Sequence, residues 1–271
     1  MRGFSLVELL VSMALMVTIG ATLLRLMTSA SVIARAQPAA ADVQQRARAA
    51  LVALGRDLAR AGAGLDGGPL SGTLAQYVPA IGPSPEGGIA IWYVSSRDAQ
   101  GELPSGAGGG TTEVVIRSTA CPVAQSACAF SPSTNVLLFD AAGCSAIARV
   151  DHVTDMTLQL RTPIAACAIR PGGAAAQVEA RTFYVDPIAH QLIRRDEATG
   201  IDLPLLDGVD SMRAEYFDAV SEGAPAIDPV LDARNVRRVR VTLRLIPSDT
   251  RAGVPSFVFA LDVAPPNLSL R

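Results

Sequence analysis

Glu8 is the residue whose chemistry demands the most explanation, because it is the single charge in the apolar run 4–24. An ionised carboxylate in hydrocarbon costs roughly 2.5–3.5 kcal/mol on membrane-insertion scales, so it needs a partner. Ser5 and Glu8 have the spacing of a capping box, in which Ser5 caps a helix and Glu8 reaches back to a backbone N–H near the positive end of the helix dipole. That arrangement alone would place Glu8 at a membrane interface.

Four cysteines form the second group with possible chemistry. No His or second Cys lies at the short spacings that a zinc site needs, so metal binding is not expected. An even number of cysteines behind an export-like segment predicts disulfides in an oxidising compartment, such as the bacterial periplasm. Nearness in the chain favours pairing Cys121 with Cys128 and Cys144 with Cys167, although four cysteines allow three connectivities and the sequence alone does not choose among them.

The remaining candidate residues do not form a catalytic pattern. His152 and His190 are the only histidines, and neither has Cys or His ligands beside it. The glycine-rich run 106–110 lacks the Lys-Ser/Thr that follows in a phosphate-binding loop, so it reads as a flexible loop. Four acidic residues lack the DxDxDG spacing of a calcium loop and are expected in solvated turns: Asp196, Glu197, Asp207 and Asp210. We therefore expect no enzyme activity and no cofactor.

The composition suits one globular domain with an appendage. The chain has 271 residues, of which 49% are hydrophobic and only 18% charged, so it can bury a core and is too apolar to be disordered. A net charge of −2 gives no field that would collect nucleic acid or coat an anionic membrane. Nucleic acid is therefore not an expected partner.

The apolar run 4–24 is long enough to span a membrane. At about 1.5 Å per residue its ~21 residues cover the ~30 Å hydrocarbon core. A cleaved secretory signal is the rival interpretation, with a cut after the Ala-Arg-Ala of residues 34–36. Against it, the run is too long, Arg25 and Arg35 interrupt the approach to that site, and Glu8 lies where a signal should be purely apolar. A membrane-spanning helix is the favoured reading.

A helical pattern continues beyond the membrane to about residue 62. Apolar residues recur there at spacings of three and four, at Val43, Ala47, Leu51, Leu54 and Leu58. Polar residues fall elsewhere, at Gln45, Arg48, Arg56 and Arg60. Pro38 should remove a backbone hydrogen bond and bend the rod, and the Gly-Ala-Gly of residues 62–64 should end it. The whole helix would be ~80–90 Å long, with its second half packed on a globular domain.

From about residue 89 the periodicity becomes strand-like. Gly/Pro/Ser-rich breaks such as 82–85 and 106–110 separate the runs, which favours an α+β fold with a mainly antiparallel sheet and long loops packed on one helix. The expected strands are 89–94, 112–117, 136–139, 156–160, 178–185, 190–195, 212–217, 236–245 and 257–263.

The clearest strand is 236–245, which alternates apolar and polar residues. Val239, Val241, Leu243 and Leu245 would face a core. Arg238, Arg240 and Arg244 would share the other face, which we expect to be solvated, with a subunit or ligand contact as the alternative. No aromatic side chains interleave these arginines, as nucleic-acid stacking would need.

The start of the chain resembles the leader and cleavage site of type IV prepilins and type II secretion pseudopilins. The residues that carry the resemblance are Met1-Arg2-Gly3 followed by Phe4-Ser5-Leu6-Val7-Glu8-Leu9-Leu10. It implies that a prepilin peptidase cuts between Gly3 and Phe4 and that the new amino group of Phe4 is methylated. In this family the residue matching Glu8 neutralises the amino terminus of a neighbouring subunit during assembly, which would supply the buried partner.

The rest of the chain resembles PilW-like minor pilins more loosely. The matching segments are Arg56-Asp57-Leu58-Ala59-Arg60-Ala61-Gly62, Phe183-Tyr184-Val185-Asp186, Leu192-Ile193-Arg194-Arg195, Leu206-Asp207-Gly208-Val209-Asp210-Ser211-Met212, Glu215-Tyr216 and Val239 to Leu245. Residues 65–180 match only in general character, and J-type pseudopilins of type II secretion share several features. A filament-borne adhesin or binding head remains a further alternative.

The resemblance implies a pilin-like fold and a defined domain order. The expected parts are a leader at 1–3, a transmembrane or filament-core helix at 4–24, its periplasmic continuation at 25–62 and a β-rich head at 63–271. The implied location is the inner membrane, crossed once with the head in the periplasm, and then the pilus or pseudopilus. The implied partners are prepilin peptidase, other minor and major pilins or pseudopilins, and the inner-membrane assembly platform.

Overall fold

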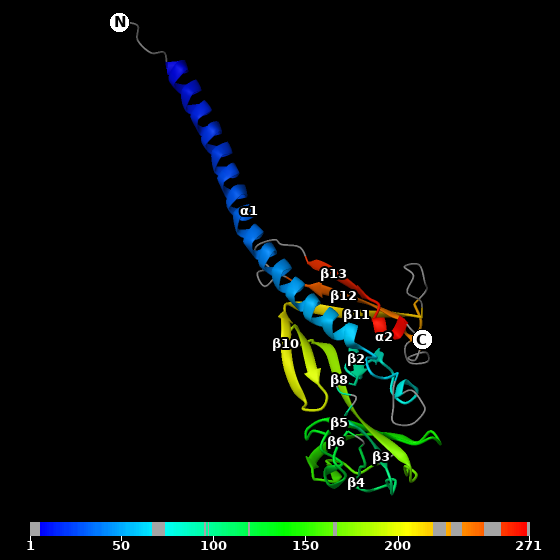
Figure 1. Cartoon of the computed structure of the whole chain (residues 1–271). Coiled ribbons are helices and arrows are strands. Elements are labelled where there is room, and N and C mark those ends of the chain that lie inside the picture. Colours follow the sequence, from blue (N-terminus) through cyan, green and yellow to red (C-terminus); the bar gives the residue numbers. More distant parts are fainter. Residues whose placement is uncertain are drawn as a thin grey trace.

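The computed structural model describes residues 6–66, 74–94, 96, 98–118, 120–164, 167–218, 226–228, 235–246 and 256–269. One long helix, α1 (Leu6–Arg60), stands free over its first half and lies against a β-rich head over its second half (Figure 1). The architecture is therefore α+β.

Helix α1 has 55 residues and passes through Pro38 without interruption. At about 1.5 Å per residue it is ~80 Å long. Figure 1 shows its axis changing direction partway along. A proline such as Pro38 removes a helix hydrogen bond and is a usual cause of such a bend. The helix ends at Arg60, and Gly62 and Gly64 follow with positive φ angles of 76° and 71°. The predicted glycine stop is confirmed.

The apolar stripe on the second half of α1 packs on the head as its periodicity predicts. Val43, Ala47, Leu54 and Leu58 are buried, and Leu51 is partly buried against the same core. Ala50 is also buried on this face. The polar residues Gln45, Arg48, Arg56 and Arg60 are exposed, so this part of the helix is amphipathic.

A ten-stranded sheet is organised around β8 (Gly173–Asp186), the longest strand. Strands β2 (Ile89–Tyr93) and β9 (Gln191–Asp196) pair with its second half, and β1 (Ile81–Pro83) and β10 (Ile201–Asp207) extend these two sides. Strands β3 (Gln100–Leu103) and β5 (Asn135–Phe139) pair with its first half. The strand therefore runs from the helix junction into a distal lobe (Figure 1).

The distal lobe continues the sheet from β5. Strand β6 (Ser145–Val153) pairs with β5, β7 (Thr157–Leu160) pairs with β6, and β4 (Glu113–Val115) pairs with β7. Two single-turn 3₁₀ helices accompany the sheet, at Leu74–Gln76 and Val123–Gln125. The lobe has a hydrophobic core of its own, built around residues such as Ile116, Val136 and Leu158.

A second sheet has three strands, β11 (Val209–Phe217), β12 (Arg238–Leu245) and β13 (Phe257–Val263). It lies along the head-bound half of α1, and the short helix α2 (Pro266–Ser269) follows it (Figure 1). One hydrophobic core joins α1 to both sheets, with Leu54, Ile91, Phe183 and Val241 all buried in it. Every pairing between these strands is antiparallel.

The structure corrects several sequence predictions of strands. The predicted break 82–85 begins inside β1, and strands β3, β6 and β10 were not expected. The strand expected at 112–117 is shorter, at Glu113–Val115, and β8 begins five residues before the predicted 178. Two sheets are present where one was expected. The run 106–110 is a loop, as predicted.

Candidate assembly surface

The first half of α1 is an apolar surface with no covering partner in the described chain. Its apolar segment, Leu6–Ser31, has 26 residues and is long enough to cross a membrane, and none of it is buried. The exposed large side chains are Leu6, Val7, Leu9, Leu10, Val11, Met13, Leu15, Met16, Val17, Ile19, Leu23, Leu24, Leu26 and Met27. A surface of this size is not stable in water, so it must lie in lipid or against other helices. It is compatible with a single-pass membrane anchor.

Glu8 lies in the first turn of the described helix and is exposed. The positive end of the helix dipole favours a carboxylate there. Gly3, Phe4 and the predicted capping residue Ser5 lie outside the described residues. The hydroxyls on this segment need no outside partner; for example, Ser12 Oγ donates to the Leu9 carbonyl at 2.8 Å and Thr18 Oγ1 to the Leu15 carbonyl at 2.9 Å. Glu8 differs from them, because its carboxylate forms no such bond with any residue that the structure describes.

A buried ion-pair cluster fastens α1 to the head. Asp57, in the last turn of the helix, has a side chain that is only 4% exposed. Its Oδ1 accepts a hydrogen bond of 2.6 Å from Arg181 Nη1 on β8, and its Oδ2 accepts one of 3.3 Å from Arg194 Nη1 on β9. One carboxylate therefore holds two strands of the sheet to the end of the helix.

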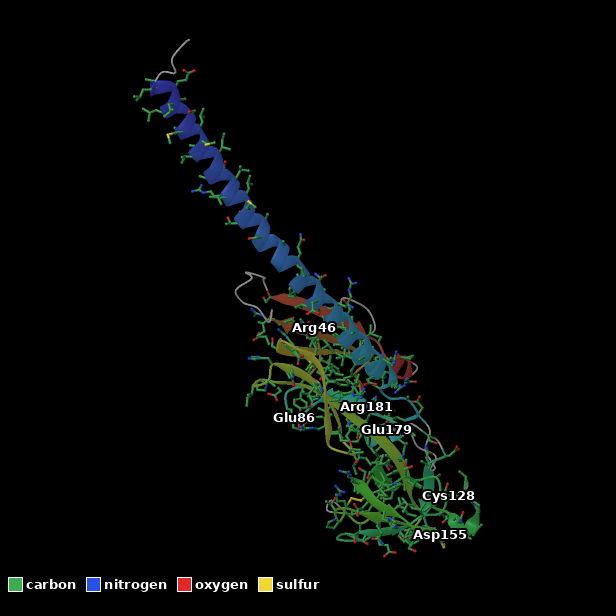
Figure 2. The ribbon with its side chains drawn as sticks, turned by 90° about the vertical axis from the view of Figure 1, so that its left-hand side faces the viewer. Arg46, Glu86, Cys128, Asp155, Glu179 and Arg181 are labelled. Atoms are coloured by element: carbon green, nitrogen blue, oxygen red, sulfur yellow. A yellow bond between two sulfur atoms is a disulfide. The ribbon has the colours of Figure 1, made fainter. Side chains whose placement is uncertain are left out.

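Two further side chains complete this cluster on the sheet. The Tyr93 hydroxyl on β2 donates to Glu179 Oε2 at 2.6 Å, and the Arg181 guanidinium lies 5.6 Å from the centre of the Tyr93 ring. Burial, together with the hydrogen bond to Glu179, raises the pKa of Tyr93 above its ordinary value. The phenol therefore stays protonated and keeps donating at any physiological pH. Figure 2 shows Glu179 and Arg181 side by side below the end of α1.

A second cluster surrounds Arg195 on β9. Its guanidinium binds both oxygens of Asp202 on β10, at 2.8 and 3.1 Å, and also reaches Glu86 Oε1 at 2.9 Å and the Tyr184 hydroxyl at 2.8 Å. The hydrogen bond from Arg195 outweighs desolvation and lowers the pKa of Asp202. Arg195 thereby connects β8, β9, β10 and the turn that precedes β2. The role of Arg195 was not evident from the sequence, because its partners lie far from it in the chain.

The arginine face of β12 is less solvated than predicted. Arg238 is buried, its Nη1 donates to Asp262 Oδ2 at 2.8 Å, and its guanidinium lies 4.1 Å from the centre of the Phe217 ring. Arg240 shares Asp262 at 2.8 Å and is partly exposed, whereas Arg244 is exposed. The neighbouring edge strands supply the acid and the aromatic ring, which the strand's own alternation could not reveal. The opposite, apolar face is buried, as predicted.

The four cysteines form two disulfides in the head, Cys121–Cys128 and Cys144–Cys167. These are the two bonds that nearness in the chain favours. The first closes the loop around the 3₁₀ helix Val123–Gln125, which lies close to Asp155 at the far end of the head from the free half of α1 (Figure 2). Two disulfides point to folding in an oxidising compartment.

The other residues considered for chemistry remain dispersed. His152 is exposed on β6, and His190 is exposed in the turn between β8 and β9 with a φ of 51°. Asp196 Oδ1 caps a turn by accepting the N–H groups of Ala198 and Thr199. Within the described ranges, no three His, Cys, Asp or Glu side chains form a group that could hold a metal ion.

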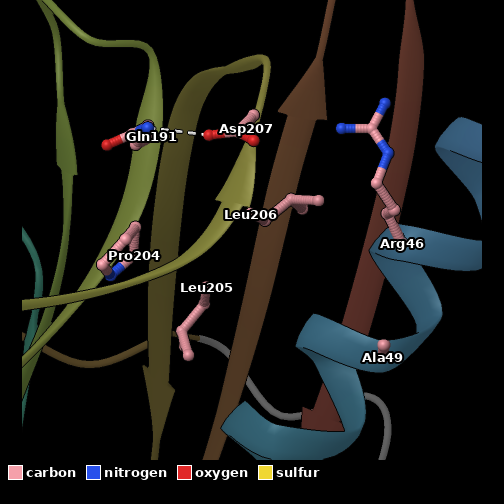
Figure 3. A pocket seen from close by; sticks show the side chains of 7 residues that line it. All are labelled: Arg46, Ala49, Gln191, Pro204, Leu205, Leu206 and Asp207. Carbon is pink, nitrogen blue, oxygen red and sulfur yellow. Dashed lines mark hydrogen bonds between the residues drawn. The ribbon is translucent and has the colours of Figure 1, made fainter.

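A groove of about 370 Å³ lies where α1 meets the β9–β10 hairpin. Figure 3 shows Arg46 and Ala49 on the helix facing Leu205, Leu206 and Asp207 on β10. Its charged groups are already engaged, because Arg46 pairs with Asp42 at 2.9 Å and Asp207 accepts a hydrogen bond of 2.7 Å from Gln191. The groove therefore presents no unpaired charge from Arg46 or Asp207 to a ligand.

Comparison of the chain with protein-family models, with curated proteins and with solved structures found no match.

Proposed function

We propose that this chain is a minor pilin-like subunit of a type IV pilus, cut by prepilin peptidase before Phe4 and built into a filament through the apolar half of α1. One observation carries the proposal. No residue of the apolar segment Leu6–Ser31 is buried, whereas one face of the later part of the same helix is packed on the head. A helix divided in this way has an apolar surface that can exchange lipid for the helices of other subunits.

The position of Glu8 supports assembly beyond simple anchoring. An anchor gains nothing from a carboxylate in its apolar part, since that group costs roughly 2.5–3.5 kcal/mol in hydrocarbon. A carboxylate near the end of the helix can instead neutralise the amino terminus that processing creates on a neighbouring subunit. The charge of Glu8 then destabilises a subunit that is alone in lipid and stabilises its contact with a neighbouring subunit.

The head-bound half of α1 supports the transmission of force between filament and head. Asp57 joins the helix to two strands of the ten-stranded sheet, and the hydrophobic core joins it to both sheets. A pull on the filament would therefore load a buried ion pair and a packed core instead of a flexible linker. The partners of this function are prepilin peptidase, other minor and major pilins, and the inner-membrane assembly platform; no catalytic step by this chain is part of it.

Glu8→Ala tests the proposed role. We expect normal membrane insertion and reduced incorporation into filaments, measured by the amount of the protein in sheared pili relative to the membrane fraction. Ser12→Ala is the matched control, because it also removes a polar group from the apolar half, and the Ser12 hydroxyl is satisfied within the helix. Equal incorporation of the two variants would contradict the proposal.

A further inference from the structure

Two lone charges of opposite sign mark the apolar half of α1. Glu8 and Arg25 are the only charged residues of Leu6–Ser31. Both side chains are exposed, and neither forms an ion pair within the described part of the chain. Any arrangement that buries this surface against other helices must bury these two charges with it. An unpaired buried charge is strongly destabilising, so each needs a counter-ion in the assembled state.

The spacing of the two charges limits where that counter-ion can come from. They are 17 positions apart, which is about 25 Å along a helix at ~1.5 Å per residue. They therefore cannot reach each other within one helix. Two parallel copies at the same height would place Glu8 beside Glu8 and Arg25 beside Arg25, which is repulsive. Only copies displaced along the helix axis by about 25 Å bring opposite charges together.

A membrane prevents this displacement before assembly. All copies in a bilayer share one orientation and one depth, and the ~25 Å between the charges is close to the ~30 Å thickness of the hydrocarbon core. Glu8 and Arg25 would then lie near opposite boundaries of the bilayer, where each can reach water and the arginine can extend toward the interface. The two charges are tolerated in the membrane because they are apart.

We propose that Arg25 of one subunit pairs with Glu8 of a second copy of this chain that is displaced outward by about 25 Å, and that this pair forms only after the outer copy has left the bilayer. The inference rests on the proposed filament function and adds a stagger and a partner residue to it. The contact is heterologous, since the two helices use different residues, so it continues from copy to copy without closing. It therefore does not close into a symmetric dimer, and a minor subunit can form it wherever two of its copies are neighbours in the filament.

This pairing is compatible with the contact between Glu8 and a processed amino terminus. Phe4 and Glu8 are four positions apart, or about 6 Å along a helix, so the amino terminus and Arg25 belong to different neighbours. A carboxylate has two oxygens and accepts hydrogen bonds on both, so Glu8 can serve both neighbours at once. Each buried charge then has a partner.

Cysteine cross-linking tests the stagger while keeping both charges in place. Ser12 and Ser29 each lie one helical turn beyond Glu8 and Arg25, respectively, so they have the same 17-position offset. One tagged copy would carry Ser12→Cys and a second, differently tagged copy Ser29→Cys. All four cysteines of the chain are already in disulfides, so the introduced thiols are the only free ones. The copies would be expressed together in the host, and sheared filaments and membranes oxidised separately.

The control is Ser12→Cys with Thr18→Cys. Thr18 lies on nearly the same face of α1 as Ser29, but its offset from Ser12 is only about 9 Å. In filaments we expect about tenfold more cross-linked dimer from the 12–29 pair than from the 12–18 pair, a factor that corresponds to ~1.4 kcal/mol. In membranes we expect no excess of the 12–29 product. Equal yields in filaments, an excess of the 12–29 product in membranes, or capture of a different protein in place of the second copy would overturn the inference.

Two substitutions of Arg25 provide an independent test, because the two possible roles of Arg25 predict opposite changes in the yield of the 12–29 product. If Arg25 pairs with Glu8, Arg25→Leu should reduce the 12–29 product to the level of the control, and Arg25→Lys should retain most of it. If Arg25 is only a boundary residue of the membrane span, Arg25→Leu adds apolar surface and should leave the product unchanged or increase it. Membrane insertion and incorporation of each variant are measured first through the tags.

These measurements separate the inference from the function on which it rests. A protein that reaches filaments without the 12–29 product refutes the stagger and leaves the proposed function in place. A protein that is processed but never found in filaments refutes the proposed function and the inference with it.

Discussion

Replacing Asp57 by asparagine keeps the size of the side chain and removes the charge that joins α1 to the head. Asp57 lies 2.6 Å from Arg181 and 3.3 Å from Arg194, and its side chain is 4% exposed, against 19% and 32% for the two arginines. The substitution therefore leaves two guanidinium groups without their shared counter-ion, in a place that water reaches only in part. We expect the junction of helix and sheet to loosen.

The size of the effect follows from this geometry. Removing one partner of a buried ion pair costs about 3–5 kcal/mol. Arg194 is about one-third exposed, and Arg181 keeps Glu179 at 3.7 Å, so we expect the lower end, about 3 kcal/mol in the free energy of unfolding. For a chain of this length, 1 kcal/mol corresponds to roughly 2–4 °C, so Tm should fall by about 6–12 °C.

Trp92 provides the assay, because it is the only tryptophan and lies on β2 beside the end of α1. Its carbonyl accepts the Gly62 N–H at 2.9 Å, so its fluorescence reports on the junction itself. Thermal unfolding of the full chain in detergent would be followed at this residue. The control is Asp42→Asn, which breaks an exposed pair with Arg46 one turn away and should cost less than about 0.5 kcal/mol. If both variants lower Tm equally, the Asp57 cluster does not fasten the helix.

Three further predictions concern the head. Burial disfavours the charge of Asp140, but the backbone N–H groups of Arg170, Cys144 and Ala142 outweigh it and hold its pKa below the ordinary value. This stabilisation is present above the unfolded-state pKa near 4 and is lost as pH falls through the lower folded-state pKa. Asp140→Asn should therefore flatten the fall of Tm as the pH is lowered below about 4. The Cys144–Cys167 bond closes a longer loop than the Cys121–Cys128 bond, with separations of 23 and 7 residues. Replacing Cys144 and Cys167 by serine should therefore lower the free energy of unfolding, measured with denaturant, by about 1 kcal/mol more than replacing Cys121 and Cys128. Gly64→Ala should lower Tm by an amount equivalent to about 2 kcal/mol, because φ is +71° and the added Cβ would lie 2.8 Å from Val94 Cβ, whereas Gly20→Ala has open space around it and should cause no loss.

The sequence predicted the elements whose signal is local. The three-four spacing of Val43, Ala47, Leu54 and Leu58 identified the buried face of α1, and the glycines after residue 60 identified its end. The alternation in β12 identified its buried face in the same way. Each of these patterns repeats between residues a few positions apart in one element, so no knowledge of the fold is needed to recognise it.

The features that the sequence did not predict depend on distant partners. Strand β10 contains Pro204 and exposes most of its side chains, so it has neither the composition nor the alternation of a typical strand, and it forms by pairing with β9. Arg238 looked solvated because Asp262 and Phe217 lie on other strands. Asp57 has no local signal of its role in the sequence, because its partners are more than 120 residues away in the chain.

For helix α1, too, the sequence predicted the local features and the structure was needed for the contacts with distant residues. The apolar run and its single carboxylate are visible in the sequence, and the structure adds that the segment Leu6–Ser31 lies away from the head with no part buried. The ion pairs that bind the second half of α1 to the sheet appear only in three dimensions. Together they give a helix whose two halves have different partners, the head for one and lipid or other subunits for the other.

The mass and sequence of the N-terminal peptide of the mature protein, purified from its native membrane, test the filament proposal most directly. The proposal predicts a chain that begins at Phe4 with a methylated amino group and keeps Glu8 four residues further on. A mature chain that begins at Gln37, after the Ala-Arg-Ala of residues 34–36, would have lost the whole apolar surface and would contradict it.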